Sequence, residues 1–431
     1  MDKKQTQTHQ ELYQWATDIF PIFRCLTGDG VRSTLNYIKN ILPSLSIHSI
    51  ESGKKVFDWE VPKEWRISEA YIEDESGNKI IDIKNNNLHI VGYSHPIDDW
   101  VSLDELNGHL HSLPDQPTAI PYITSYYASN WGFCISHNQR QLLKDENYHV
   151  VIQSELFDGV LNYGEILIPG KTNEEVLLST YVCHPSMANN EVSGPIVTTA
   201  LARWLSERTN NKYSYRIIFI PETIGSISYL SNNLHHLQSH VIAGFNITCV
   251  GDDNCYSFMP SRSGDTISDR AAKHALHHID KNFIQYSWLE NRGSDERQYC
   301  APGIDLPIAS IMRSKYSEYD EYHTSLDNLD FISAEGLGGA FEALKNAITI
   351  IEMNCVPRTK VLCEPQLGKR GLYPQISTRE TGRQVKTMMN LISLSDGTND
   401  LLTIAELINV SILDIKPLLD KLIENKILEK I

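Results

Sequence analysis

The chain has 431 residues, of which 41% are hydrophobic and 21% are charged, a composition that predicts roughly two or three folded globular domains. Its formal net charge of −16 disfavours nucleic acid and anionic membrane surfaces as partners. The eight cysteines are scattered without a CxxC pair, which excludes a disulfide-stapled fold and indicates reduced thiols. The first residues are polar and resemble no secretory signal, and no apolar run reaches the roughly eighteen residues of a membrane span. We therefore expect a cytoplasmic protein.

Residues 9–42 carry apolar side chains at helical spacing and predict two helices, separated at Gly28-Asp29-Gly30. From about residue 54 to residue 170 the chain consists of short alternating runs cut by turn residues, with a hairpin turn at residues 75–78. This pattern predicts one all-β, barrel-like module.

Beyond Thr172, near-continuous apolar runs alternate with helical segments, as is typical of strands buried on both faces. Strands are predicted at residues 175–182, 216–220 and 241–245, helices at 195–205, 224–237 and 266–279, and a long closing helix at 333–354. The predicted fold class is α/β, with a three-layer sheet whose sites lie at the carboxyl ends of the strands.

Residues 357–374, rich in Pro, Gly and basic side chains, are predicted to be a linker. Helices follow at residues 382–394, 404–409 and 412–425, a helix-turn-helix of winged-helix size. From Pro357 onward there are 11 Lys or Arg and 9 Asp or Glu, and the presumed recognition helix has no arginine. DNA binding is therefore disfavoured, and packing or formation of a homo-oligomer is the expected role.

Four polar segments near predicted strand ends are candidates for chemistry. His184 follows a buried strand, and Asn190 and Glu191 follow it in the loop before a helix. Glu222 lies where the next strand meets a helix, and His323 is the centre of a polar loop before the closing helix. The fourth segment is residues 293–298. Taken singly, each has an ordinary explanation, such as a hydrogen-bonded loop histidine or a helix-starting glutamate.

Taken together, two histidines and a carboxylate around strand ends suit a zinc site with three protein ligands and an open position for water. The metal lowers the pKa of water, and a free carboxylate nearby can take its proton.

The order of these motifs resembles that of the zinc aminopeptidase superfamily: His184-Pro185, then residues 190–194, then residues 222–226, then Gly293-Ser294-Asp295, then residues 322–325. Over nearly its whole length the chain is similar to bacterial aminopeptidase-like proteins, whose catalytic domain carries an inserted β-barrel and a C-terminal winged helix. The resemblance implies a catalytic domain at 1–52 and 171–356, a barrel-like insert at 53–170 and a winged helix at 366–431.

Carried over residue by residue, the resemblance assigns the first and last histidine ligands to His184 and His323, and the catalytic base to Glu222. Three carboxylate ligands of the two-metal enzymes are replaced, by Asn190, Thr223 and Thr248. The expectation is therefore one zinc ion, held by His184, His323 and either Asn190 or Glu191, with Glu191 favoured because an amide oxygen is a poor zinc ligand.

The implied activity is hydrolysis of an amide bond, in a small molecule or a peptide-like substrate. Such proteins are associated with polysaccharide biosynthesis, which suggests an amide linked to a sugar or a metabolite. The candidates for holding substrate are Asp295, Arg297, Gln298, Tyr181 and Tyr322. Two rival interpretations stay open: a pseudoenzyme that serves as a scaffold or binding module, and a transcriptional regulator that uses the winged helix.

Overall fold

The computed structural model describes residues 3–372 and 379–431. Its contacts divide the chain into two compact units. The first comprises Met1–Gly264 and Ile284–Glu342, and the second comprises Asp265–Phe283 and Ala343–Ile431. In the described part of the chain, no helix is both long and apolar enough to cross a bilayer.

The first unit is built on an eight-stranded sheet in the order β1-β10-β12-β11-β13-β16-β14-β15. Strands β11, β12, β13 and β16 are parallel to one another, whereas β1 and β10 pair antiparallel with their neighbours. β14 pairs antiparallel with β16 and parallel with β15. The strands are β1 (Ser46–Glu51), β10 (Val160–Ile168), β11 (Glu175–Tyr181), β12 (Ser214–Ile220), β13 (Val241–Asn246), β14 (Ser257–Met259), β15 (Ile284–Gln285) and β16 (Ile308–Met312). Every residue of β11 is buried, as its apolar run predicts.

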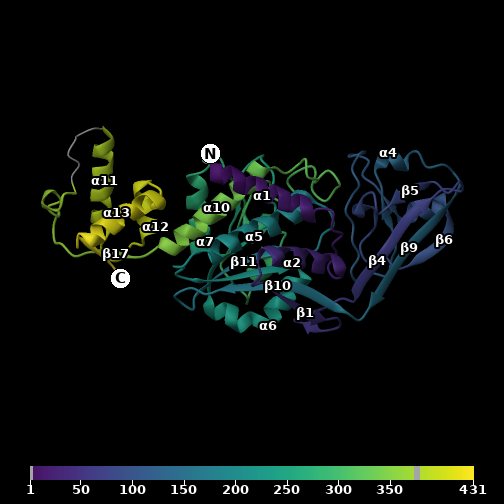
Figure 1. The fold of residues 1–431 in the computed structure, drawn as a ribbon, viewed down its shortest axis with the longest axis horizontal. Helices are drawn as coiled ribbons and strands as arrows, with labels where there is room; N and C mark the ends of the chain where they lie inside the picture. The colour runs from purple at the N-terminus through teal and green to yellow at the C-terminus, as the bar shows by residue number, and fades with distance from the viewer. Residues whose placement is uncertain (1–2, 373–378) are drawn as a thin grey trace. The chain divides into compact units, whose positions relative to one another are not determined.

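Helices cover both faces of this sheet, so the predicted three-layer α/β architecture is confirmed (Figure 1). α1 (Lys3–Ile19), α2 (Asp29–Ile41) and α5 (Ser193–Ser206) pack together on one side, and α6 (Ile224–His240) lies on the other. Shorter helices α8 (Trp288–Asn291) and α9 (Glu296–Tyr299) precede β16, and α10 (Ala334–Met353) is the long closing helix. Gly28 separates α1 from α2: its φ is +93°, and a Cβ there would lie 2.7 Å from the Trp65 carbonyl oxygen.

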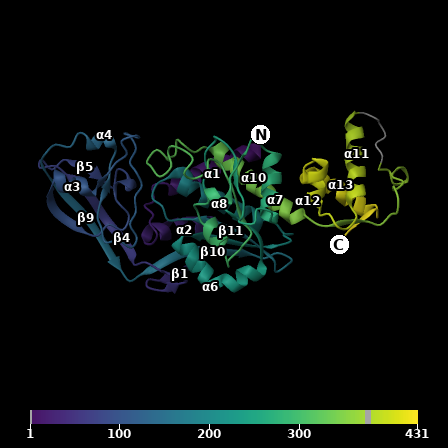
Figure 2. The same ribbon diagram turned by 180° about the vertical axis from the view of Figure 1, so that it is seen from behind.

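Between β1 and β10 the chain forms a smaller antiparallel sheet in the order β5-β4-β9-β6 (Figure 2). Its strands are β4 (Glu64–Glu73), β5 (Lys79–Asp82), β6 (Ile97–Ser102) and β9 (Asn147–Phe157). Around them lie β2 (Lys55–Val56), β3 (Trp59–Glu60), η1 (Asn87–His89), α3 (Leu103–His109), β7 (Leu110–His111), β8 (Phe133–Cys134) and α4 (His137–Arg140). Among the described residues no strand joins β5 to β6, so the sheet is open and the predicted all-β barrel is not confirmed.

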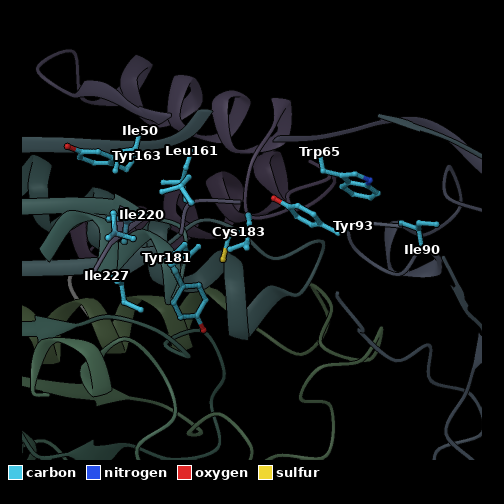
Figure 3. Packing of buried hydrophobic residues seen from close by; sticks show 14 of the residues in the cluster. Ile50, Trp65, Ile90, Tyr93, Leu161, Tyr163, Tyr181, Cys183, Ile220 and Ile227 are labelled. Atoms are coloured by element: carbon cyan, nitrogen blue, oxygen red, sulfur yellow. The ribbon is translucent and has the colours of Figure 1, made fainter. Parts of the chain in front are cut away.

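The predicted insert at 53–170 also needs a correction at its end. β10 belongs to the central sheet, where it pairs with β1 and β12. Its alternating pattern continues that of β9 because the two strands follow each other directly in the chain, although β9 pairs in the smaller sheet and β10 in the central one. Side chains from both sheets share one hydrophobic cluster, which includes Trp65 and Tyr93 from the insert and Tyr181 and Ile220 from the central strands (Figure 3).

The second unit contains the C-terminal helices and one helix from the middle of the chain. Its elements are α7 (Ile267–His277), β17 (Pro357–Thr359), η3 (Gly368–Arg370), α11 (Arg379–Leu394), α12 (Leu401–Ile408), α13 (Ile412–Glu424) and β18 (Leu428–Lys430). The last three helices match the predicted helix-turn-helix, and the β17–β18 pair forms its wing. The predicted linker at 357–374 contains β17 and η3, and its last two residues lie outside the described part.

Candidate active site

The candidate site lies where two neighbouring parallel strands end. Tyr181 of β11 pairs with Ile220 of β12, so the residues after them emerge side by side. His184 and Glu222 follow these strands, and the His184 Nε2 atom lies 3.6 Å from the Glu222 Oε2 atom. His184 is buried, whereas the Glu222 side chain is 20% exposed and can meet a ligand. The structure brings together two side chains that the sequence placed in one site.

The loop after His184 enters α5 through one turn of π-helix, η2 (Ala188–Val192). Such turns are frequent at functional sites, and this one carries Asn190 and Glu191. The Glu191 Oε2 atom accepts a hydrogen bond from His184 Nδ1 at 2.9 Å, which leaves Nε2 directed at Glu222. Glu191 therefore sits behind the imidazole, the usual place of a carboxylate that orients a ligand histidine.

A buried arginine completes this arrangement. The Arg24 Nε atom lies 3.2 Å from Glu191 Oε1 and donates to the His184 carbonyl oxygen at 3.0 Å. Arg24 and Glu191 are each 1% exposed, so the two charges neutralise each other out of water. Burial lowers the pKa of His184, but the Glu191 hydrogen bond and the charges of Glu191 and Glu222 outweigh it, and the net shift is upward.

His323 reaches the site from the loop before α10, with a left-handed backbone (φ +55°). Its ring centroid lies 5.8 Å from that of His184, and the Tyr122 ring contacts both histidines edge-on, at 5.1 and 5.3 Å. Burial and the neighbouring His184 lower the pKa of His323 to about 3. The imidazole is therefore neutral, as a metal ligand must be.

The His323 loop is held by the insert. The Tyr122 backbone N–H donates to the His323 carbonyl oxygen at 2.8 Å, and Pro121 forms a bridge with Thr324. The Ile120 N–H donates to the Ser325 hydroxyl oxygen at 3.0 Å. The site thus includes backbone from the insert, although the sequence placed all its candidates in the catalytic domain.

Glu222 and Asp295 are two acidic side chains close enough for the charge of one to act on the other. The Glu222 Oε1 atom accepts from the Ser294 hydroxyl at 2.9 Å. Asp295 is fully buried and accepts from the Thr223 N–H at 2.8 Å and the Ser226 hydroxyl at 2.7 Å. Burial raises the pKa of both carboxyls, and the charge of Glu222 raises that of Asp295 further. Asp295 thus supports the turn that carries Glu222, whereas the sequence suggested it as a substrate contact.

Asn190 occupies the position of a bridging acid in the family pattern. Its Nδ2 atom donates to the Tyr181 hydroxyl at 2.9 Å, and that hydroxyl lies 2.5 Å from Thr248 Oγ1. The Asn190 Oδ1 atom is buried and has no hydrogen-bond partner among the described residues. A buried oxygen of this kind is costly unless something binds to it.

The structure gives different surroundings to the remaining substrate candidates, Arg297, Gln298 and Tyr322. Arg297 is exposed and donates to the Thr223 hydroxyl at 2.9 Å, and Gln298 is half-buried beside it. Tyr322 stacks on His323 with ring centroids 3.9 Å apart.

One group of possible metal-binding side chains stands out among the described residues: donor atoms of Cys183, His184 and Glu191 lie within 4.8 Å of one another. Burial raises the pKa of the Cys183 thiol, however, and Glu191 is already bound to Arg24. Of this group, His184 is therefore the donor best suited to zinc.

Sequence reasoning missed three residues. Arg24 is 160 positions from His184, and its one signal is a charge between apolar neighbours in Phe23-Arg24-Cys25. Tyr122 lies in the insert, with no motif to mark it. Asp327 accepts from the Asn189 and Asn190 N–H groups at 2.6 and 2.9 Å and so fixes η2. It belongs to the polar loop that the sequence singled out, but its role depends on a contact with the distant η2.

Two family models match the chain. One, described as a domain of unknown function (DUF4910), matches residues 13–354, and one described as a winged helix-turn-helix matches residues 355–430. A Clostridium acetobutylicum protein is 44% identical over 409 residues, which is 93% of this chain and 92% of that protein. It bears the provisional name of a polysaccharide biosynthesis protein with an aminopeptidase-like domain.

Solved structures confirm the predicted fold. A provisionally assigned peptidase from Clostridium acetobutylicum is 41% identical, with a TM-score of 0.94, over 100% of this chain and 98% of that one. A zinc aminopeptidase from Bacillus subtilis has a TM-score of 0.59 at 12% identity, over 80% of this chain and 94% of its own. A peptidase M28 precursor from Shewanella amazonensis has a TM-score of 0.56 at 13% identity, over 85% and 99%. The chain thus has the zinc aminopeptidase fold and a C-terminal winged helix.

Proposed function

Because the chain belongs to the family described as a domain of unknown function (DUF4910), we propose its activity from its own site: zinc-dependent hydrolysis of an amide bond. The observation that carries the proposal is the convergence of His184, His323 and Glu222 at the carboxyl end of the sheet. This is where sites of such sheets form, and the zinc aminopeptidase fold is consistent with the chemistry.

His184 and His323 would hold one zinc ion, with Asn190 Oδ1 as the third donor. The set fits zinc because one imidazole is oriented by Glu191, the other is neutral, and the amide oxygen is buried without a partner. Glu191, which the sequence favoured as third ligand, is better explained as the partner of His184 and Arg24. When bound, zinc polarises a substrate carbonyl and makes water a stronger acid.

Glu222 acts as the general base and then as the acid. Its carboxylate takes a proton from the attacking water and passes it to the leaving nitrogen. Ser294 fixes one carboxylate oxygen, and the other faces His184. Arg297 would contact the substrate, while Asp295 holds the turn of Glu222 in place. The name of the Clostridium acetobutylicum relative supports a sugar-linked or metabolite-linked amide as the substrate.

The first prediction tests the role of Glu222. Purified protein is assayed by mass spectrometry against peptide amides and N-acylated amino sugars. We expect Glu222→Gln to lower kcat by about 10²–10⁴-fold, because it removes the general base. The matched control is Glu105→Gln, at an exposed glutamate of α3, which should keep full activity. Equal turnover in the two variants would exclude this mechanism, and absence of turnover in the wild-type protein would favour the pseudoenzyme interpretation.

The second prediction concerns the metal. Elemental analysis of protein purified without added metal should find about one zinc per chain, and His323→Ala should lower that content severalfold with little change in the circular dichroism spectrum. His277→Ala, at an exposed helix position, is the control. Less than about a tenth of an equivalent of transition metal in the wild-type protein would contradict a zinc site.

A further inference from the structure

A cavity opens at the side of the insert. Its volume is about 320 Å³, within the range of small-molecule sites. Three tyrosines line it, Tyr93, Tyr126 and Tyr127, together with Lys63, Glu60 and Asp158. No function is yet assigned to it.

Tyr126, one of the residues that line the cavity, lies close to the candidate site. Tyr126 lies beside Tyr122, whose ring contacts both His184 and His323. Burial is the main cause of the raised pKa of Tyr126, and Cys183, Cys25 and Glu222 add smaller contributions. Tyr126 therefore belongs both to the wall of the cavity and to the surroundings of the candidate site.

The walls of the cavity combine aromatic surface with charged side chains. Tyr127 is 58% exposed, and its hydroxyl donates to the Glu60 carbonyl oxygen at 2.7 Å, which fixes the ring. Trp59, 42% exposed, lies beside it with ring centroids 6.3 Å apart. Lys63 and Asp158, which also line the cavity, form an ion pair at 3.7 Å and remain open to solvent.

We propose that this cavity binds the sugar part of a sugar-linked amide substrate. A pyranose ring presents C–H groups that pack on an aromatic face and hydroxyl groups that need polar partners. The tyrosines offer aromatic faces for the C–H groups, and Lys63, Glu60 and Asp158 offer polar partners for the hydroxyl groups. An aliphatic peptide side chain would use the aromatic surface and leave the charged groups without new partners. The use of this site in catalysis rests on the proposed amide hydrolysis, but sugar binding itself does not.

The test is binding of hexosamines to the full-length protein by calorimetry and saturation-transfer NMR. The probes are glucosamine, galactosamine, mannosamine and their N-acetyl forms, with alanine amide and leucine amide as peptide-like probes. We expect at least one hexosamine to bind, neither amide to compete with it, and Tyr127→Ala to raise its Kd at least about tenfold. Tyr127→Phe, which keeps the ring, should stay within about threefold of wild type.

Trp100→Ala is the matched control, because Trp100 is another exposed aromatic residue of the insert, 51% exposed and outside the cavity. Glu222→Gln should bind the sugar as wild type does, so loss of hydrolysis and loss of sugar binding are separable. The proposal is overturned if no hexosamine binds, if Tyr127→Ala and Trp100→Ala weaken binding equally, or if the peptide-like amides displace the sugar. Absence of all hydrolysis with sugar binding intact would overturn the proposed function alone.

Discussion

At the scale of single residues, the buried trio of Arg24, Glu191 and His184 fixes the orientation of the histidine in the candidate site. A charged pair that is removed from water is tolerated only when both partners are present. The pair sits directly behind the histidine that faces Glu222. Stability and function therefore depend here on the same contacts, and a change in Arg24 should affect both.

Arg24→Met is expected to lower the free energy of unfolding by about 3–5 kcal/mol, because Glu191 is left as an uncompensated buried charge. Urea denaturation followed by circular dichroism measures the loss. Arg203→Met is the control: Arg203 pairs with Glu11 at 32% and 40% exposure, and its loss should cost about 1 kcal/mol or less. A double variant, Arg24→Met with Glu191→Leu, should recover part of the stability. Equal losses for Arg24→Met and Arg203→Met would contradict the assignment.

Much of the candidate site could be predicted at this scale, since His184, Glu222 and His323 stand at strand ends and in motif order. What the sequence could not supply is the direction of each side chain. Glu191 is a plausible ligand from spacing alone. In the structure, however, its carboxylate contacts His184 Nδ1 and the Arg24 guanidinium, on the side of the imidazole away from Glu222. Contacts across 160 positions leave no local pattern.

At the scale of elements, the start of α13 depends on one neutral histidine. The His274 Nε2 atom accepts the Ile412 N–H at 3.0 Å, where the first N–H groups of the helix need partners. Burial, with smaller contributions from His278, His277 and Arg270, lowers the pKa of His274 from 6.5 to about 4. A protonated ring could not accept this bond and would place a cation at a helix N-terminus.

The pH dependence of stability follows from this shift. The unfolded chain takes up the proton near pH 6.5 and the folded chain only near pH 4, so the stabilisation is complete above about pH 6.5. The melting temperature of the second unit should fall as the pH is lowered from 6.5 to 4, as calorimetry can follow. His274→Gln, which keeps an acceptor but does not titrate, should flatten the curve, and His277→Gln should not. A curve unchanged by His274→Gln would contradict this role.

The elements also show where sequence patterns stop being informative. Apolar runs identified the buried parallel strands, because burial on both faces leaves an unmistakable composition. Alternation in the insert identified strands but not whether the sheet closes, since closure depends on tilt and register between distant strands. The sequence pattern places β10 in the insert, whereas the structure places it in the central sheet. The alternation of apolar and polar residues does not reveal this, because it is the same in both sheets.

At the scale of the whole molecule, the net charge of −16 bears on the winged helix. Nonspecific DNA binding depends on neutralising phosphates with Lys and Arg. We expect fluorescence anisotropy with a labelled random-sequence duplex at about 20 mM salt to show no binding tighter than about 100 μM. A known winged-helix DNA-binding protein measured in parallel is the control. Salt-dependent binding near or below about 1 μM would support the regulator interpretation.

The backbone contacts between the insert and the His323 loop limit how far the chain can be shortened by protein engineering. Many enzymes can be trimmed to a smaller catalytic core, but here the backbone of Pro121 and Tyr122 pairs with Thr324 and His323. A version with the insert replaced by a short turn would release a histidine from its left-handed conformation and remove the tyrosine beside both imidazoles. The smallest unit that can keep this site therefore includes the insert, and exchange of inserts between relatives must carry this loop along.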